Sequence, residues 1–166
     1  MHSEIRPATA RDARILAELR YEFRSAITPA RESASDFIAR CERWMKERLP
    51  SNHAENHEKH WWAWLAHHNT VPCGTVWLHR FDKLPNPVEE REAHGYITSL
   101  FVKPEARGAG VGTALLGAAL SVCESAGLDS VILWPTPLSR SLYQRHGFAP
   151  RDDVLLRVLE GPHRGA

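Results

Sequence analysis

A run of alternating glycines carries the clearest chemistry in this sequence. Gly108, Gly110 and Gly112 follow Arg107, and a stripe of apolar residues at helical spacing begins at Val111. Glycines let the backbone approach a ligand, and the first turn of a helix leaves N–H groups free to bind an anion. The arginine adds a fixed positive charge that hydrogen-bonds phosphate oxygens. The pattern therefore predicts a phosphate-binding turn rather than a turn that is only structural.

Three classes of ligand carry such a phosphate: a nucleotide, a dinucleotide and coenzyme A. A nucleotide-binding P-loop needs Gly-Lys-Ser/Thr, whereas this run ends in Gly112-Thr113 without a lysine. A dinucleotide fold needs G-x-G-x-x-G and an acidic residue at the end of the next strand. Here the glycine spacing differs and the next strand ends in Trp134-Pro135. Both nucleotide readings are therefore disfavoured.

The elements around the glycines predict an α/β fold. A strand over 93–102 precedes the turn, and Pro104 ends it because proline cannot donate to a ladder. A strand over 129–134 follows the helix, so strand, helix and strand form a right-handed parallel unit. Apolar spacing predicts the other elements: a strand at 4–8, a helix capped by Thr9 and Asp12 and ending near 25, a helix at 35–49, a hairpin of 61–66 and 71–79, a helix at 138–146, and last strands at 148 and 154–159.

Composition excludes several classes of protein. The 166 residues suit one domain, with 43% hydrophobic and 25% charged residues and a net charge of +1. A net charge this small does not indicate binding to nucleic acid or to an anionic membrane. No apolar run is long enough to span a bilayer. The chain opens without a signal-peptide pattern. Three scattered cysteines, an odd number, favour a cytoplasmic protein without a disulfide framework.

A histidine-rich segment is the one candidate for metal binding. His53 and His57 are four residues apart, and His60 follows them. On a helix this spacing binds metal. The surrounding Asn, Glu and Lys residues favour a solvated linker instead, so we expect no metal.

Two blocks of the sequence together resemble a known family. Arg107-x-x-Gly110-x-Gly112 resembles the acetyl-CoA motif of the GNAT superfamily of N-acetyltransferases, and Ser141–Phe148 resembles the family's second block, with its Leu-Tyr and Gly-Phe pairs. The resemblance covers about residues 4–159 and implies one GNAT-like domain over 1–166. It also implies a mixed, mostly antiparallel sheet of six to seven strands, with a splayed central parallel pair and helices on both faces.

The resemblance implies where acetyl-CoA would bind. Its pantetheine arm would lie along the strand backbone, its pyrophosphate would lie on the glycine turn, and Thr136 would contact the pantetheine or only cap the next helix. The implied cofactor-binding residues are Leu100, Phe101, Val102, Arg107, Gly108, Ala109, Gly110, Val111, Gly112, Thr113 and Thr136. The N–H of Leu100 matches the family's oxyanion donor. Tyr143 matches the family's catalytic tyrosine, which donates a proton or a hydrogen bond to the departing sulfur.

The general base is left open by the sequence. Family members often place Glu or His on the central strand, two or four residues before the position of Leu100. This chain has Thr98 and Tyr96 there. Glu92, His94 and Glu22 are further candidates, as is water relayed through Tyr96 or Thr98.

Three functions are therefore weighed. The first is an enzyme that transfers acetyl from acetyl-CoA directly to a primary amine of a small molecule or peptide. The second is a non-catalytic acyl-CoA sensor on the same fold, and the third, disfavoured, is a nucleotide-dependent oxidoreductase. An acidic loop with Glu89, Glu90 and Glu92 leans slightly toward a cationic amine. A homodimer is compatible with this fold but is not readable from the sequence.

Overall fold

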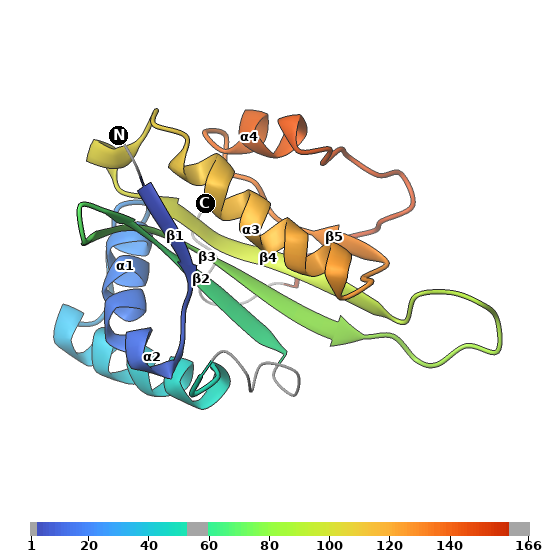
Figure 1. Cartoon of the computed structure of the whole chain (residues 1–166), viewed down its shortest axis with the longest axis horizontal. Helices are drawn as coiled ribbons and strands as arrows, with labels where there is room; N and C mark the ends of the chain where they lie inside the picture. Colours follow the sequence, from blue (N-terminus) through green and yellow to red (C-terminus); the bar gives the residue numbers. More distant parts are fainter. Residues whose placement is uncertain (1–2, 53–59, 160–166) are drawn as a thin grey trace. The chain divides into compact units, whose positions relative to one another are not determined.

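The computed structural model describes residues 3–52 and 60–159. The chain divides into two compact units, residues 1–134 and 135–166, and each is described by itself. In the first unit, the described residues form one sheet of five strands in the order β1-β2-β3-β4-β5, in which only β4 and β5 are parallel (Figure 1). The strands are β1 Ser3–Pro7, β2 Trp61–His68, β3 Val71–Asp82, β4 Ala93–Val102 and β5 Ser130–Ile132.

Helices complete both units. The first unit contains the 3-10 helices η1 Ala10–Asp12 and η3 Pro104–Ala106 and the α-helices α1 Ala13–Ser25, α2 Ala34–Arg48 and α3 Val111–Ser125. The second unit contains α4 Arg140–Arg145. None of the helices among the described residues is long and apolar enough to cross a membrane. The predicted α/β class, the parallel pair and the helices on both faces are confirmed.

The predicted strand count of six to seven is wrong for the described residues. Phe148 and the segment 154–159 belong to no strand, and large side chains such as Leu155 are almost fully exposed. Their apolar, β-branched composition had suggested two last strands. Such residues favour a strand because their side chains pack well on a pleated sheet. A strand forms, however, only where a neighbouring strand supplies the ladder of hydrogen bonds.

A partly buried ion pair links β1 to the start of α1. The N–H of Thr9 donates to Asp12 Oδ2 at 2.8 Å, as the predicted capping pair requires. Arg6 adds two bonds to the same carboxylate, at 3.0 and 2.6 Å. Burial by itself would raise the pKa of Asp12, but the hydrogen bonds from Arg6 and Thr9 outweigh it and lower that pKa. The contact joins β1 to the helix that begins at Ala13.

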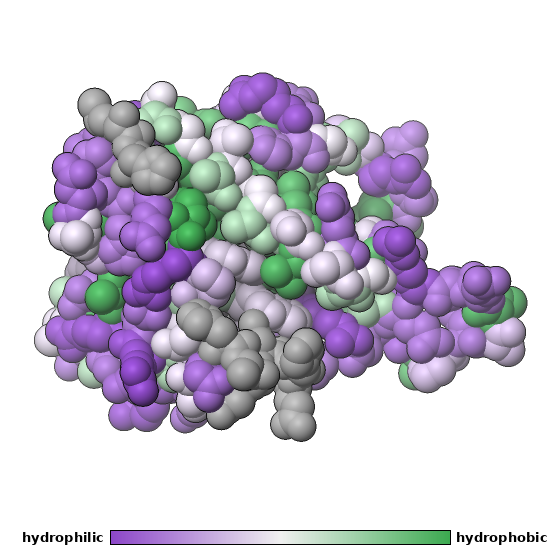
Figure 2. Space-filling view, viewed as in Figure 1, coloured by the Kyte–Doolittle hydropathy of each residue, from purple (hydrophilic) through white to green (hydrophobic). Residues whose placement is uncertain are grey.

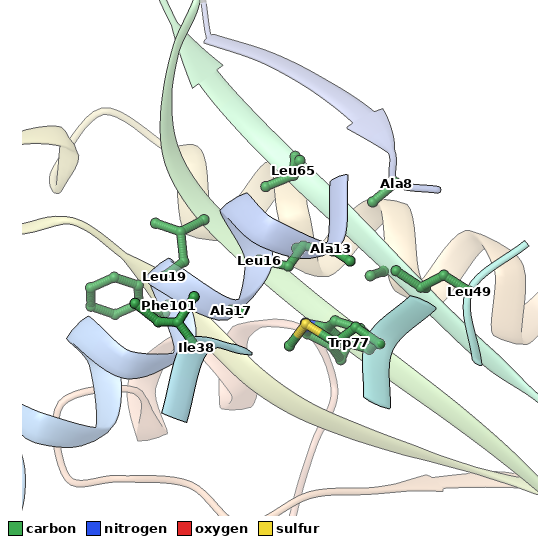
Figure 3. Packing of buried hydrophobic residues seen from close by; sticks show 12 residues of the cluster. Ala8, Ala13, Leu16, Ala17, Leu19, Ile38, Leu49, Leu65, Trp77 and Phe101 are labelled. Atoms are coloured by element: carbon green, nitrogen blue, oxygen red, sulfur yellow. The ribbon is translucent and has the colours of Figure 1, made fainter. Parts of the chain in front are cut away.

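One face of the sheet packs against α1 and α2. Trp77 from β3 and Phe101 from β4 join the apolar residues of both helices, as Figure 3 shows for Leu16, Leu19 and Ile38. We call this side the aromatic face. Its members share cross-strand positions on β2, β3 and β4: Trp61, Trp77, His79, Phe81 and Tyr96.

The opposite face packs against α3, which Figure 1 shows running across the sheet. A Cβ on Gly74 would lie 2.8 Å from the carbonyl oxygen of Phe101 and 3.2 Å from Leu115 of α3. Glycine at this position therefore allows a close approach of β3, β4 and the helix. The buried residues of α3 are Val111, Leu115, Leu116, Ala119 and Cys123.

The loop between β3 and β4 projects beyond the sheet (Figure 1), and its surface is mainly hydrophilic (Figure 2). Its acidic residues are engaged locally. Glu90 pairs with Lys83 at 3.2 Å and accepts a hydrogen bond from the side chain of Asn86, while Glu92 accepts one from the backbone N–H of Asn86 at 3.2 Å. Two of the three carboxylates that were predicted to attract a cationic amine, Glu90 and Glu92, are therefore bonded to residues of the loop itself.

Candidate active site

Strand β4 is distorted at the position where the reaction centre was predicted. Thr98 lies opposite Trp77 and Phe101 lies opposite Thr75, so Ser99 and Leu100 together face the single residue between them on β3. Ser99 has a φ of 53°, which is uncommon for a residue with a side chain. An extra residue of this kind bends a strand and re-aims its backbone groups. The bulge therefore changes the direction of the N–H of Leu100.

The parallel ladder between β4 and β5 ends before the bulge. Its last pair is Tyr96 and Ile132, although β4 continues to Val102. Beyond β5 the chain reads Trp134-Pro135-Thr136-Pro137, and its two prolines cannot donate to a ladder. Among the described residues, the β5 side of 97–102 has no strand partner. This open backbone edge suits an extended ligand that pairs as an additional strand.

The glycine turn lies at the end of the same strand. Gly108 and Gly110 have φ angles of 76° and 79°, which only glycine adopts readily, and Gly110 caps α3. The first hydrogen bond of the helix runs from Ala114 N–H to Gly110 at 3.0 Å, so the N–H groups of 111–113 have no partner within the helix. Arg107 Nε donates to the carbonyl of Val102 at 2.9 Å, which ties the turn to β4. The turn that follows the open edge therefore offers backbone N–H donors at the start of α3.

Ten of the eleven predicted cofactor residues therefore lie in two neighbouring stretches of the chain: 100–102 at the distorted end of β4, and 107–113 in the turn and the first residues of α3. Phe101 contributes only backbone, since its ring is buried and stacks on Phe23 at 5.3 Å. The stretch 106–113 contains no carboxylate. Free N–H groups, an open edge and a positive charge without opposing acids fit the chemistry of coenzyme A.

The second unit carries the remaining predicted residues. Tyr143 of α4 is 7% exposed, and its ring meets that of Phe148 edge-on at 5.7 Å. Gly147 ends the helix with a φ of 84°. Thr136 and Ser139 bond each other through their hydroxyls at 3.0 Å, and the N–H of Thr136 donates to Ser139 Oγ at 2.9 Å. These bonds form the turn before α4; the catalytic role of Tyr143 and the pantetheine contact of Thr136 stay predictions.

The candidate bases differ in how strongly they are engaged. Glu22 pairs with Lys103 at 3.4 Å, and Glu92 lies in the projecting loop. His94 Nδ1 lies 2.8 Å from Ser130 Oγ and 3.7 Å from Asp129. Tyr96 donates its hydroxyl to Thr98 Oγ1 at 3.1 Å. Thr98 directly precedes the bulge. The hydrogen-bonded hydroxyls of Tyr96 and Thr98 therefore lie along β4 next to the bulge.

Two residues at the site were missed from the sequence. Arg20 of α1 donates from Nη1 to Ser99 Oγ at 2.7 Å, across 79 residues of chain. His79 lies opposite Tyr96 on β3 and stacks on Trp61 at 4.2 Å. Burial, and secondarily the charge of His60, lower the pKa of His79, so its imidazole is neutral near pH 7. The alternation of β3 could have placed His79 on this face, but no local signal marks Arg20.

A shallow hollow elsewhere on the surface is a weaker candidate. It is lined by Ala39, Glu42, Arg43, Lys46 and Glu47. All five belong to α2, and the carboxylate of Glu42 is already paired with Lys46. The hollow is a groove between the polar side chains of one helix.

Known proteins share both the sequence pattern and the fold. The model of the Acetyltransferase (GNAT) family matches residues 20–148, which include the bulge, the turn and α4. The chain belongs to the GNAT family of acetyltransferases. No curated protein sequence matches it.

Solved GNAT structures cover nearly the whole chain. A predicted acetyltransferase from Clostridium acetobutylicum, crystallised with acetyl-CoA, is 24% identical, with a TM-score of 0.73 over 98% of this chain and 100% of its own. A GCN5-related N-acetyltransferase from Ralstonia eutropha is 24% identical, with a TM-score of 0.69 over 95% and 99%. A ribosomal-protein-alanine N-acetyltransferase from Brucella melitensis is 20% identical, with a TM-score of 0.66 over 97% and 100%. These likenesses establish the fold, and the family establishes acetyl transfer as the general chemistry.

Proposed function

We propose that this GNAT protein transfers the acetyl group of acetyl-CoA directly to a primary amine of a small molecule or peptide. The observation that carries the proposal is the combination of the Ser99–Leu100 bulge with the open edge of β4 and the free N–H groups of 111–113. Acetyl-CoA supplies an activated thioester. The chain supplies backbone donors for both ends of such a ligand, and the family match supports this use.

In this proposal the backbone near the bulge stabilises the charge that develops on the reacting carbonyl oxygen. The N–H of Leu100 is the donor, re-aimed by the distorted backbone at Ser99. One such donor is typically worth about 3 kcal/mol of transition-state stabilisation. Tyr143 hydrogen-bonds the departing thiolate. Because the pKa of a phenol is near 10 and that of a thiol near 8.5, complete proton transfer from Tyr143 would be uphill by about 2 kcal/mol.

The amine must lose a proton before or during attack. Tyr96 and Thr98, joined by their 3.1 Å hydrogen bond, form a relay on the aromatic face, and the neutral His79 stands opposite Tyr96. A water held by these groups accepts the proton and passes it toward the imidazole. This assignment replaces Glu22 and Glu92, whose carboxylates are bonded elsewhere.

The cytoplasm is the proposed compartment. Cys41, Cys73 and Cys123 are free thiols, in keeping with the scattered cysteine pattern of the sequence. The homodimer stays a prediction.

Thermal unfolding tests the cofactor. Acetyl-CoA at 100 times its dissociation constant should stabilise the protein by about 2.7 kcal/mol, a shift of several degrees. NADH and ATP serve as controls and should give no shift. A shift with either of them and none with acetyl-CoA would reject the proposal.

Turnover separates an enzyme from a sensor. Release of coenzyme A thiol is followed with a panel of primary amines and without any acceptor. We expect acceptor-dependent release and an acetylated product by mass spectrometry. Stabilisation by acetyl-CoA without release on any amine would instead identify a binding protein on the same fold.

A further inference from the structure

Arg20 is a half-buried cation at the reaction centre. It lies on α1, its Nη1 donates to Ser99 Oγ at 2.7 Å, and its guanidinium carbon lies 5.9 Å from the centre of the Phe23 ring. Burial lowers the pKa of Arg20, and the like charge of Arg24 lowers it further. A guanidinium has five N–H donors, and the hydroxyl of Ser99 neutralises none of its charge. Removal of such a charge from water is costly unless an anion compensates it.

Most carboxylates on the surrounding elements are paired with other cations, and Asp36 of α2 accepts a hydrogen bond from Ser33 instead. On α1, Glu18 pairs with Arg14 and Glu22 pairs with Lys103. On and before α2, Glu42 pairs with Lys46, and Glu32 pairs with Arg40. β4 contains no carboxylate. Within the part of the chain that the structure describes, no acid lies within ion-pair distance of Arg20.

A second arginine stands one turn further along the same helix. Arg20 and Arg24 both lie over Phe23, at 5.9 and 6.0 Å from its ring centre. Like charges at this spacing destabilise a helix. An anion between them would remove that repulsion. The two cations and the aromatic ring thus form a positively charged cluster that is chemically suited to a carboxylate.

The position of this cation limits the acceptor. Ser99, which Arg20 contacts, directly precedes Leu100, whose N–H is the proposed donor to the reacting carbonyl. Consecutive Cα atoms are about 3.8 Å apart, so the contact of Arg20 with Ser99 lies close to the N–H of Leu100. A ligand that binds Arg20 and places its amine at the reacting acetyl carbonyl therefore has only a few bonds between the two groups. A guanidinium binds a carboxylate with two parallel hydrogen bonds.

We propose that the acceptor is an amino acid or a similarly small amine whose carboxylate lies within a few bonds of its amine, and that Arg20 binds this carboxylate. The inference rests on the proposed acetyltransferase function and names its substrate class. It departs from the cationic acceptor suggested by the acidic loop, where Glu90 and Glu92 are already engaged. Arg20 thereby determines specificity as well as contacting the bulge.

Matched acceptors test the inference. We compare L-amino acids with their amides, for example L-phenylalanine with L-phenylalaninamide, by thiol release. The wild-type protein should prefer the acids by at least tenfold in kcat/KM. Arg20→Gln should lose at least tenfold on the acids and less than twofold on the amides, while Arg11→Gln, at an exposed arginine before α1, should change neither.

A second variant separates recognition from support of the bulge. Ser99→Ala removes the hydroxyl that Arg20 contacts but leaves the positive charge in place. It should retain the preference for acids. If Arg20→Gln lowers activity equally on acids and amides, or if Ser99→Ala matches Arg20→Gln, Arg20 only holds the bulge and the inference is overturned.

Binding without turnover keeps the two proposals distinguishable. Thermal shifts are measured with sodium phenylacetate and with phenylacetamide, each with and without coenzyme A. We expect phenylacetate to stabilise the protein and phenylacetamide to have no effect. The stabilisation by phenylacetate should be lost in Arg20→Gln and kept in Ser99→Ala. Stabilisation by phenylacetate through Arg20 without any by acetyl-CoA would support the anion site and overturn the acetyltransferase. No difference between the two probes in the wild-type protein would overturn the anion site.

Discussion

On the side of α3 the sheet meets aliphatic residues such as Leu115 and Leu116, whereas on the side of α1 and α2 it presents Trp77, His79 and Tyr96. The α3 sequence carries a single acid, Glu124, and its ligand-binding capacity lies in the backbone of its first turn. The aromatic face carries arginines, histidines and hydroxyls that converge from separate elements.

Under the proposed function, the difference reflects what each face must recognise. A pyrophosphate is bound by N–H groups that any helix terminus offers, so glycines and a helix suffice on the α3 side. An acceptor differs from one family member to another, and only side chains can distinguish its functional groups. The four predictions below test this division between a backbone site and a side-chain site.

The start of α1, which packs on the aromatic face, carries the partly buried ion pair of Arg6 and Asp12. Asp12→Ala should lower the free energy of unfolding by about 2–3 kcal/mol, because it removes a cap and leaves Arg6 without its partner. Because the pKa of Asp12 is below its usual value of 3.8, this stabilisation is present above about pH 4 and is lost as the pH falls further. Urea titrations at pH 7 and pH 3 measure both effects.

The exposed pair of Arg14 and Glu18 is the control for that measurement. Both side chains are at least half exposed, at 57% and 50%. Glu18→Ala should cost no more than about 0.5 kcal/mol. Equal losses in Asp12→Ala and Glu18→Ala would show that α1 does not rely on the pair of Arg6 and Asp12.

The glycine turn should respond to backbone strain alone. Gly110→Ala forces a side chain into a φ of 79°, at a cost of about 1–2 kcal/mol, and should weaken acetyl-CoA binding by roughly tenfold or more. Gly117→Ala is the matched control, since it lies within α3 and a Cβ there meets open space. It should leave affinity unchanged. Isothermal titration with acetyl-CoA would contradict the backbone site if both variants bound like the wild-type protein.

Tyr96→Phe should affect chemistry without affecting the cofactor. Loss of the hydroxyl breaks the bond to Thr98 and the proposed proton relay. We expect kcat to fall about tenfold, at the lower end of general acid–base effects, with an altered pH–rate profile. The dissociation constant for acetyl-CoA should stay the same. An unchanged kcat and pH–rate profile would remove Tyr96 from the relay.

His79 should give the smallest effect, a change in the slope of stability against pH. Because burial lowers its pKa in the folded protein, the unfolded state binds the proton more readily. Its contribution is therefore present above about pH 6.5, the usual pKa of histidine, and is lost as the pH falls. Between pH 7 and 5.5, thermal unfolding of His79→Gln should depend less on pH than that of the wild-type protein. Parallel pH curves would refute this role.

Several elements follow from local patterns. The strand at 93–102 was predicted with its observed bounds, and Pro104 explains its end. The helix predicted at 35–49 lies at 34–48, and the hairpin turn at 68–70 has Asn69 and Thr70 at positive φ. The Thr9–Asp12 cap and the glycine turn were likewise readable. Each of these depends on neighbours within a few residues.

Other features required the folded chain. β3 extends to Asp82 because β4 pairs with it there, and 154–159 forms no strand despite its apolar composition. The bulge at Ser99 appears only in the register between β3 and β4. His53 and His57 lie outside the described residues, so the histidine segment keeps its prediction.

The sequence by itself determined the family, the acetyl-CoA motif and the strand that leads to it, because backbone recognition is encoded in contiguous glycines and a helix start. Only the tertiary structure brought Arg20 to Ser99 and His79 opposite Tyr96. Contacts between residues far apart in the chain leave no periodic trace in the sequence, since they arise when separate elements pack on one sheet face. The residues of the proposed acceptor site are therefore absent from the motif and come together only in the fold.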